Sequence, residues 1–381
     1  MNAPPMSFGG RMQNVQPDGD AAIRQTDSDA ALARFSAVQK GYFTDPFIKP
    51  LLPRGSQYQP PRPPLINVGT YVRSEAIDAL VSQWITLAGQ EGKKCQIVSL
   101  GAGSDTRFWR IANSPQKDLL ASYVELDFSE NTTKKAMAIR KSRELSALLG
   151  TPDDVKLANG GTALHAPVYH LVPADMRKSP DEVFPTSFGI DGGDRSHIIS
   201  PNLPTLLLFE CVLVYMKPSE SDAVIKWFTD YFSTSSESTV LGGIVYEMFG
   251  LNDSFGKVML NNLKARNVDL PGAEPYPTFA SLPQRFLRHG FDVARALTLR
   301  EIRRAYIDPV ELERISHLEL LDEIEELELV LDHYAITWGV KLYEKGSSLG
   351  ASWKGWGLHP KIYDDDSGSD VSIRASDMLR R

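Results

Sequence analysis

The sequence predicts an α/β fold organised around a doubly wound, mostly parallel β-sheet. Strand-like apolar runs alternate with helix-like runs through the middle of the chain, an order typical of parallel sheets covered by helices on both faces. The first apolar run, CQIVSLGAG, ends in glycines directly before a helical stretch. The last two strand-like runs, FDVARALTL and LELVLDHYAITWGVKL, depart from the alternation, and we expect them to form a closing antiparallel pair.

Two helices are expected before the first strand, where they would form an N-terminal helical cap. Residues 27–40 begin with side chains that can cap a helix and carry Leu32, Phe35 and Val38 near helical spacing. Prolines break the next segment, and we expect 60–64 to form a rigid loop. Residues 70–88 have the pattern of an amphipathic helix.

Five strands are expected through the middle of the chain. They are, in order, CQIVSLGAG, SYVELDF, the weaker VYHLVPADM, the strong run TLLLFECVLVYM, and STVLGGIVYEMF. The helices between them are expected over SDTRFWRIAN, over 129–149 with Ser129 as its N-cap, and over SESDAVIKWFTDYF. An acidic helical stretch at about 309–326 then separates the sixth strand from the seventh.

The chain of 381 residues is long enough for one large domain with additions. We expect that domain over 27–363, with loop-rich insertions at about 159–204 and 250–290. Residues 1–26 and the acidic end, 364–381, are polar and are expected to be disordered tails.

Composition excludes several functional classes. A net charge of −7 gives no overall basic field for nucleic acid or a membrane surface. No run reaches the roughly 18 apolar residues of a membrane helix, and the start has no pattern of a secretory signal or transit peptide. Cys95 and Cys211 are far apart in apolar runs, so we expect reduced core cysteines in a cytoplasmic protein, with the nucleus as a further location. His165, His170, His197, His289, His317 and His333 show no metal-ligand spacing.

The sharpest local signal is VSLGAGSDTR, where a strand ends in Gly101 and Gly103 and a helix begins. Glycines let the backbone approach a ligand, but a tight turn without any ligand explains them equally well. Asp127 ends the next strand, where an acid can accept hydrogen bonds from ribose hydroxyls. Together they favour a nucleoside site over a simple helix cap. NAD is the main rival cofactor, although Thr106 stands where a third glycine is expected.

Five motifs in this order resemble the leucine carboxyl methyltransferase family. They are QKGYFTDPFI (39–48), RPPLINVGTYVR (62–73), LGAGSDTRFWR (100–110), VELDF (124–128) and LLLFECVLVYM (206–216). The resemblance spans about 33–342 and implies a class I S-adenosylmethionine-dependent methyltransferase. Its Rossmann-like seven-stranded sheet would have the order 3-2-1-4-5-7-6 with an antiparallel last strand, and the added helical and loop segments would form an acceptor pocket.

The resemblance also implies a site for S-adenosyl-L-methionine, with S-adenosyl-L-homocysteine as product. Lys40 and Arg73 would hold the methionine carboxylate, a task for which the planar guanidinium is well suited. Gly101 would line the methionine end, Asp127 would bind the ribose, and Glu210 would lie beside the amino group and sulfonium. The remaining assignments place Asp175 and Met176 at the adenine and Tyr215 at the acceptor carboxylate.

Each of these residues has an ordinary structural alternative. Lys40 could be a solvated cation at a helix end, Arg73 could form a surface ion pair, and Tyr215 could simply pack. Asp175 follows a poorly marked strand. Glu210 is different, because an unpaired carboxylate within an apolar strand is energetically costly.

The family acts on the C-terminal leucine of the protein phosphatase 2A catalytic subunit, so the resemblance implies carboxyl methylation of that partner. We expect the enzyme to be a monomer. A carboxylate acceptor is already ionised at neutral pH and needs no general base. Two other functions stay open: a small-molecule O-methyltransferase of the polyketide-tailoring type, and a non-catalytic protein that binds the phosphatase tail. The related enzyme of tRNA wybutosine synthesis is disfavoured because its propeller extension is absent here.

Overall fold

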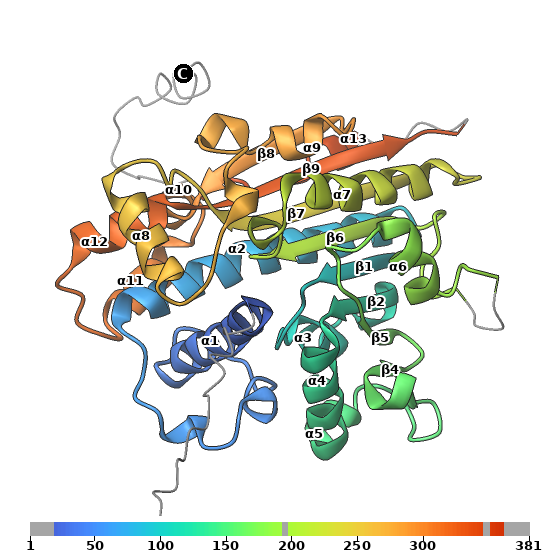
Figure 1. The fold of residues 1–381 in the computed structure, drawn as a ribbon, viewed down its shortest axis with the longest axis horizontal. Coiled ribbons are helices and arrows are strands. Elements are labelled where there is room, and N and C mark those ends of the chain that lie inside the picture. The colour runs from blue at the N-terminus through green and yellow to red at the C-terminus, as the bar shows by residue number, and fades with distance from the viewer. Residues whose placement is uncertain (1–18, 193–196, 346–350, 362–381) are drawn as a thin grey trace, which may run out of the picture.

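The computed structural model describes residues 19–192, 197–345 and 351–361, and within them one nine-stranded sheet forms the centre of the molecule (Figure 1). Its spatial order is β3-β4-β5-β2-β1-β6-β7-β9-β8. The strands are β1 (Cys95–Leu100), β2 (Leu120–Asp127), β3 (Lys156–Ala158), β4 (Ala163–His165), β5 (Tyr169–Pro173), β6 (Thr205–Glu210), β7 (Thr239–Met248), β8 (Val293–Thr298) and β9 (Tyr334–Tyr343).

The predicted strand order is confirmed for the seven main strands. From β5 through β2, β1 and β6 to β7 the neighbours pair in parallel, and β9 is antiparallel to both β7 and β8. The expected count of seven is too low, however, because β3 and β4 add an antiparallel edge beside β5. These two strands have only three residues each, too few for an alternating apolar pattern to show in the sequence.

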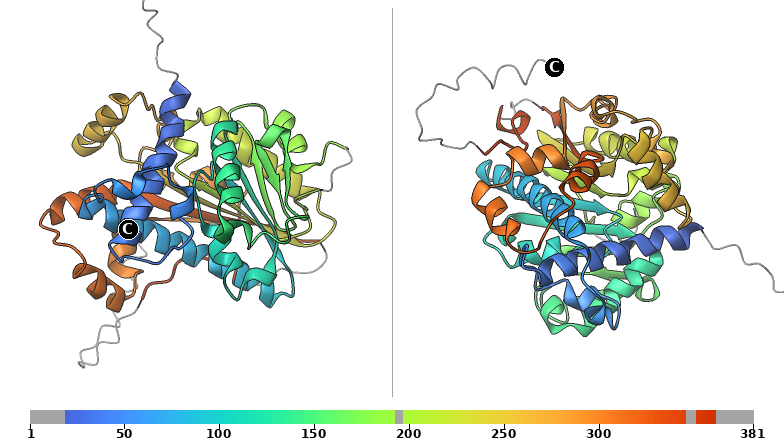
Figure 2. Two further views of the ribbon diagram at one scale, coloured as in Figure 1. Left: turned by 90° about the horizontal axis from the view of Figure 1, so that it is seen from below. Right: turned by 90° about the vertical axis from the view of Figure 1, so that its left-hand side faces the viewer.

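Helices cover both faces of the sheet, as Figures 1 and 2 show. Successive strand residues point to opposite faces: Ile97 joins the core under α2, whereas Val98 joins the core under α6 and α7. The helices are α1 (Gly19–Gln39), α2 (Pro64–Gln90), α3 (Arg107–Ala112), α4 (Ser129–Lys141), α5 (Arg143–Ser146), α6 (Pro180–Phe188), α7 (Pro218–Ser233), α8 (Ser254–Lys264), α9 (Gln284–Leu287), α10 (Leu299–Ala305), α11 (Pro309–Ser316), α12 (Ile324–Asp332) and α13 (Ala351–Lys354).

The N-terminal helices are longer than the sequence pattern predicts. Helix α1 begins at Gly19, so residues 19–26, expected in the tail, are helical. This polar first part has no apolar stripe, and it is held by tertiary contacts such as the ion pair of Asp20 with Arg177. Helix α2 begins at Pro64 rather than at residue 70, because proline fits the first turn of a helix. Residues 1–18 and 362–381 lie outside the described parts of the chain, so both disordered tails stay predictions.

Three other elements differ from the prediction. The fourth strand ends at Glu210, and the rest of its apolar run forms a turn over Leu213–Tyr215 in which Leu213 and Val214 are buried. The single helix over 129–149 is split, because Ser142 has extended backbone angles, and Ser129 is its first residue rather than its cap. Residues 327–332, expected as strand, belong to α12, whose acidic first turn suits a helix start.

None of the helices in the described ranges is long and apolar enough to cross a membrane.

Candidate functional site

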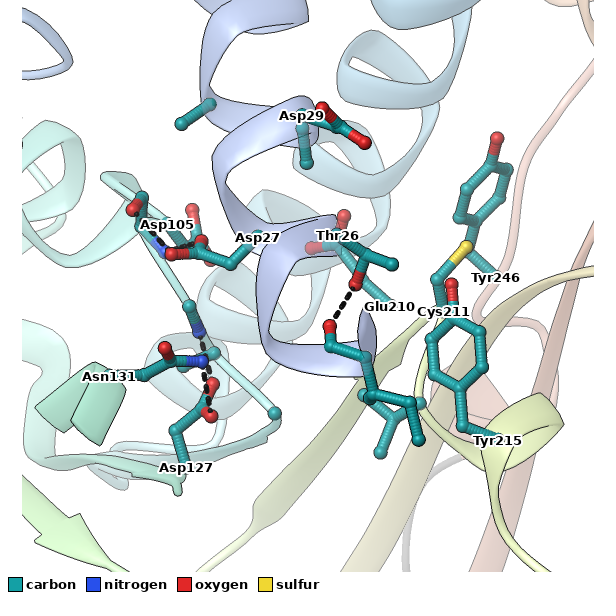
Figure 3. A pocket seen from close by; sticks show the side chains of 18 of the residues that line it. Thr26, Asp27, Asp29, Asp105, Asp127, Asn131, Glu210, Cys211, Tyr215 and Tyr246 are labelled. Carbon is teal, nitrogen blue, oxygen red and sulfur yellow. Dashed lines mark hydrogen bonds between the residues drawn. The ribbon is translucent and has the colours of Figure 1, made fainter. Parts of the chain in front are cut away.

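A cavity of about 360 Å³ lies at the carboxyl-terminal edge of the sheet, beneath α1 (Figure 3). Its lining includes the loop after β1, the ends of β2 and β6, and side chains from α1 and α2. Strand β1 pairs with β2 on one side and with β6 on the other, so the chain reverses its direction of winding there. This is the point where doubly wound sheets bind ligands.

The loop after β1 is built around Gly101. Its φ is +69°, and a Cβ at this position would lie 2.4 Å from Cγ2 of Val212. The Gly101 amide donates to the Leu126 carbonyl at 2.7 Å, which ties the loop to β2. The absence of a side chain therefore lets the loop pass between β2 and the turn that follows β6.

Asp127 lies at the end of β2 and is only 6% exposed. Its carboxylate accepts from the backbone N–H groups of Gly103 and Phe128, each at 2.7 Å, and from Nδ2 of Asn131 at 2.9 Å. Burial raises the pKa of Asp127, against the lowering effect of the hydrogen bonds from Gly103 and Asn131. The Oδ1 atom of Asn131 is buried without a hydrogen-bond partner, so this end of the cavity holds an acceptor that can receive a ligand hydroxyl or amino group.

Arg73 and Glu210 face each other in the same cavity. Arg73 extends from α2, and its Nε and Nη2 atoms donate to Oε2 of Glu210 at 3.0 and 2.8 Å. The guanidinium also lies over the ring of Tyr246, 4.3 Å from its centroid. Burial alone would lower the pKa of Arg73, but the Glu210 carboxylate outweighs burial and raises it. The cavity thus presents a cation and an anion side by side.

A second arginine, Arg107, contacts the other oxygen of Glu210. Its Nη1 lies 2.8 Å from Oε1, and the residue is 3% exposed. Arg107 is not among the residues predicted from the sequence, because an arginine at the start of a helix looks like a surface cation. One signal was available: a cation is unfavourable at a helix N-terminus, so a compensating carboxylate was to be expected nearby.

Asp175 and Met176 line the cavity and follow β5, whose last residue pairs with Asp127 of β2. Asp175 accepts from Nε and Nη2 of Arg177, both at 2.9 Å, and hydrogen bonding to Arg177 lowers the pKa of Asp175. Arg177 also pairs with Asp20 of α1, at 2.6 Å. This contact fastens the start of α1 to the segment after β5.

The opposite end of the cavity is richer in aromatic and apolar side chains. Figure 3 shows Cys211, Tyr215 and Tyr246 on the side away from Asp127 and Asn131, with α1 crossing between the two groups. Burial raises the pKa of Tyr215, so its hydroxyl stays protonated at neutral pH. The cavity therefore combines a polar end with an end suited to an apolar group.

Lys40 is the one predicted site residue that the structure does not bring to the cavity. It is not among the lining residues, and its Nζ lies 3.2 Å from Oε1 of Glu319. Lys40 follows the last residue of α1, where the chain turns away, and a nearby acid satisfies its charge. Lys40 therefore does not contribute to the lining of the cavity in this structure, and its role at the cofactor stays a prediction. The other seven predicted residues line one cavity: Arg73, Gly101, Asp127, Asp175, Met176, Glu210 and Tyr215.

Helix α1 closes the cavity through Asp27, another residue that sequence reasoning did not assign to the site. Its Oδ1 accepts from the Ser104 amide at 2.6 Å, and its Oδ2 accepts from the Ser104 hydroxyl at 3.1 Å. A further ion pair joins Asp29 to Arg266, just beyond α8. The helical cap and the loop after β1 thus share direct contacts.

Comparison with known proteins gives a consistent result. The model of the family described as "Leucine carboxyl methyltransferase" matches residues 22–229. Leucine carboxyl methyltransferase 1 of Cryptococcus neoformans is 44% identical over 345 residues, covering 84% of this chain and 94% of that protein. The Emericella nidulans protein of the same name is 38% identical, covering 88% of each chain. An Arabidopsis thaliana homolog is 34% identical and covers 84% of this chain and 89% of its own. This chain therefore belongs to the leucine carboxyl methyltransferase family, and it is a methyltransferase.

Proposed function

We propose that this protein uses S-adenosyl-L-methionine to methyl-esterify the C-terminal leucine carboxylate of the protein phosphatase 2A catalytic subunit. The observation that carries the proposal is the Arg73–Glu210 pair, which lies in the same cavity as Asp127. An α-amino acid zwitterion offers a carboxylate to Arg73 and an ammonium to Glu210, and a ribose offers hydroxyls to Asp127. One ligand with both chemical ends is S-adenosylmethionine.

The residues of the cavity fit such a cofactor along its length. Asp127 would bind the ribose hydroxyls, and Asp175 with Met176 would lie at the adenine, where the free acceptor of Asn131 supplies a further polar contact. Gly101 would let the backbone approach the methionine end. The bound cofactor would supply an activated methyl group, and S-adenosyl-L-homocysteine would be the product.

The contribution of the protein to the reaction would be positioning and exclusion of water. A carboxylate acceptor is ionised at neutral pH, so no proton must be removed before it attacks the methyl group. This agrees with the described lining of the cavity, which contains no histidine. Tyr215 keeps its proton and can donate a hydrogen bond to the acceptor carboxylate, while Arg73 holds the amino-acid end of the cofactor.

The role of Arg73 can be tested by calorimetry with S-adenosylhomocysteine. Arg73→Ala is expected to abolish measurable binding, because the variant removes the bidentate partner of the ligand carboxylate and leaves Glu210 with less positive charge nearby. Arg288→Ala serves as the matched control, since Arg288 also pairs its charge with a carboxylate, that of Asp222, but is not part of the cavity lining. Undiminished binding by Arg73→Ala would refute its assignment.

The acceptor can be tested with purified phosphatase 2A and methyl-labelled cofactor. We expect a base-labile label on the C-terminal peptide, located to the leucine carboxylate by mass spectrometry. A phosphatase whose terminal carboxylate is amidated should take up no label. No label on the unmodified phosphatase, with turnover on small hydroxylated compounds, would instead support an O-methyltransferase of the polyketide-tailoring type. Stable phosphatase binding without turnover would support a non-catalytic tail-binding protein.

We further propose that the enzyme acts as a monomer in the cytoplasm, and also in the nucleus. Free Cys95 and Cys211 agree with a reducing compartment.

A further inference from the structure

We propose that Arg107 is a positioning residue that keeps Glu210 in place while Arg73 exchanges its partner, Glu210, for the carboxylate of the cofactor. This inference rests on the proposed function. It assigns a role to a residue that neither the motifs nor the family resemblance singled out.

Both oxygens of Glu210 are paired, each with a different arginine. Arg73 directs Nε and Nη2 to Oε2, whereas Nη1 of Arg107 lies 2.8 Å from Oε1. Glu210 lies at the end of β6, with its side chain 17% exposed. A carboxylate this far from water needs a compensating charge at every stage of ligand binding.

Binding of an amino-acid zwitterion changes the partners that Arg73 and Glu210 must contact. The ligand carboxylate needs the donors that Arg73 now gives to Glu210, and the ligand ammonium needs a carboxylate oxygen of Glu210. Once Arg73 turns to the ligand, Arg107 is the described guanidinium that still contacts Glu210. Without Arg107, Glu210 would retain Arg73 more strongly, and the ligand carboxylate would have to compete for it.

Arg107 is itself fixed and is a poor candidate for direct contact with the cofactor carboxylate. Its Nε donates to Oδ1 of Asp78 at 2.9 Å, and its Nη1 donates to Oδ2 of Asp105 at 2.5 Å. Its side chain is 4% exposed. Burial favours loss of its charge, but the carboxylates of Asp105, Glu210 and Asp78 outweigh burial and raise the pKa of Arg107. It therefore stays charged and oriented.

The position of Arg107 also couples the two ends of the cavity. Asp105 belongs to the loop after β1, and the Asp105 carbonyl accepts from Nζ of Lys135 at 2.8 Å. Gly103 in the same loop donates to Asp127. The loop that positions the ribose-binding carboxylate thus continues directly into the arginine that positions Glu210.

Calorimetry with two ligands separates this role from general structural support. S-adenosylhomocysteine carries the amino-acid end, and 5′-methylthioadenosine lacks it. Arg107→Met is expected to weaken S-adenosylhomocysteine binding by about 10- to 100-fold, the range for loss of a charged hydrogen bond. The same variant should leave the affinity for 5′-methylthioadenosine within about 3-fold of the wild type. Arg107→Lys, which keeps a cation, should recover part of the selective loss.

Three further variants complete the experiment. Arg110→Met is the matched control, because Arg110 also pairs with Asp78 but does not contact Glu210 or line the cavity. It should not change the ratio of the two affinities. Glu210→Gln should reproduce the selective loss, and adding Arg107→Met to it should cause little more, because both substitutions disable the same group.

The ratio of affinities is measured on the folded protein, so partial loss of stability does not obscure it. If Arg107→Met lowered the affinity for both ligands equally, or left the affinity for S-adenosylhomocysteine unchanged, the positioning role would be overturned. If wild-type protein bound neither ligand, the proposed function itself would fail, and that outcome is distinct from any result obtained with the variants.

Discussion

At Gly101 the backbone conformation and the space around the residue both exclude a side chain. A left-handed conformation costs most L-residues about 1–2 kcal/mol, and φ here is +69°. A methyl group would in addition press against Val212, 2.4 Å away, in the turn that follows Glu210. One substitution would therefore disturb the loop after β1 and the end of β6 together.

We predict that Gly101→Ala weakens binding of S-adenosylhomocysteine at least about 10-fold, since strain and overpacking together cost about 2–4 kcal/mol. Gly55→Ala is the matched control, because Gly55 has a φ of +83° but no atom within 4 Å of the added methyl. It should lower the melting temperature slightly and leave binding unchanged. If calorimetry gave the same affinity for S-adenosylhomocysteine in Gly101→Ala and Gly55→Ala, steric overlap at Gly101 would be contradicted.

The second prediction at the scale of single residues concerns a buried ion pair that lies away from the cavity. Arg285 is fully buried and donates to Glu247 through Nε at 3.0 Å and Nη2 at 2.5 Å. Removing one partner of a buried pair leaves an uncompensated charge, so Arg285→Met should cost about 3–5 kcal/mol in the free energy of unfolding. Denaturant unfolding measures this cost.

Arg288→Met provides the comparison for this pair. Arg288 pairs with Asp222 near the surface, where ion pairs contribute about 0–1 kcal/mol. The double variant Arg285→Met with Glu247→Gln should recover part of the loss, because it removes both charges. A double variant less stable than Arg285→Met alone would show that the pair is not the cause.

At the scale of secondary-structure elements, α1 connects the N-terminal helical cap to the loop after β1. Asp27 accepts from the amide and the hydroxyl of Ser104, directly after Gly103, and a Cβ on Gly103 would lie 2.3 Å from Oδ1 of Asp27. The helix therefore contacts the loop too closely to move independently of it. Opening of α1 should be coupled to the order of the loop that lines the cavity.

We predict that Asp27→Ala increases hydrogen exchange in α1 and around Ser104, because two charge-assisted hydrogen bonds worth roughly 1.5–3 kcal/mol each are lost. Asp29→Ala removes a carboxylate from the same helix, but its partners Arg266 and Arg62 both have solvent-exposed side chains, so the change should be much smaller. Exchange that rises equally in both variants would argue against a specific tether by Asp27.

The sequence predicts the order of the helices and strands along the chain, but not all of the residues at which they begin and end. The alternating apolar runs predicted the order of the strands along the chain, whereas their order in the sheet was implied by the family resemblance. Seven of the eight predicted site residues line one cavity. The end of β6 was missed because Val212 and Val214 are as apolar as a strand yet are buried in a turn. Arg107 was missed for a different reason. Its partners Asp78 and Glu210 are distant in the sequence, and its place at a helix start indicates that a carboxylate is nearby but not which one.

At the scale of the whole molecule, how deeply a side chain is buried depends on where its strand lies in the sheet. Its centre is covered on both faces, whereas β3 and β4 form a short edge beside β5. His170 on β5 lies opposite His165 on β4, and their Nδ1 atoms are 3.2 Å apart. Burial, with a smaller effect of His165, lowers the pKa of His170 to about 4. The sheet edge thus favours a neutral imidazole.

This lowered pKa predicts a loss of global stability in acid. Between the ordinary value of 6.5 and about 4, the unfolded chain binds a proton at His170 that the folded protein excludes. The free energy of unfolding should therefore fall as pH decreases through this window, by roughly 1–3 kcal/mol from this group. His170→Gln should flatten the slope between pH 6.5 and 4 in denaturant unfolding, whereas His317→Gln, at an exposed position, should not. A slope that His170→Gln leaves unchanged would assign the acid sensitivity to other groups.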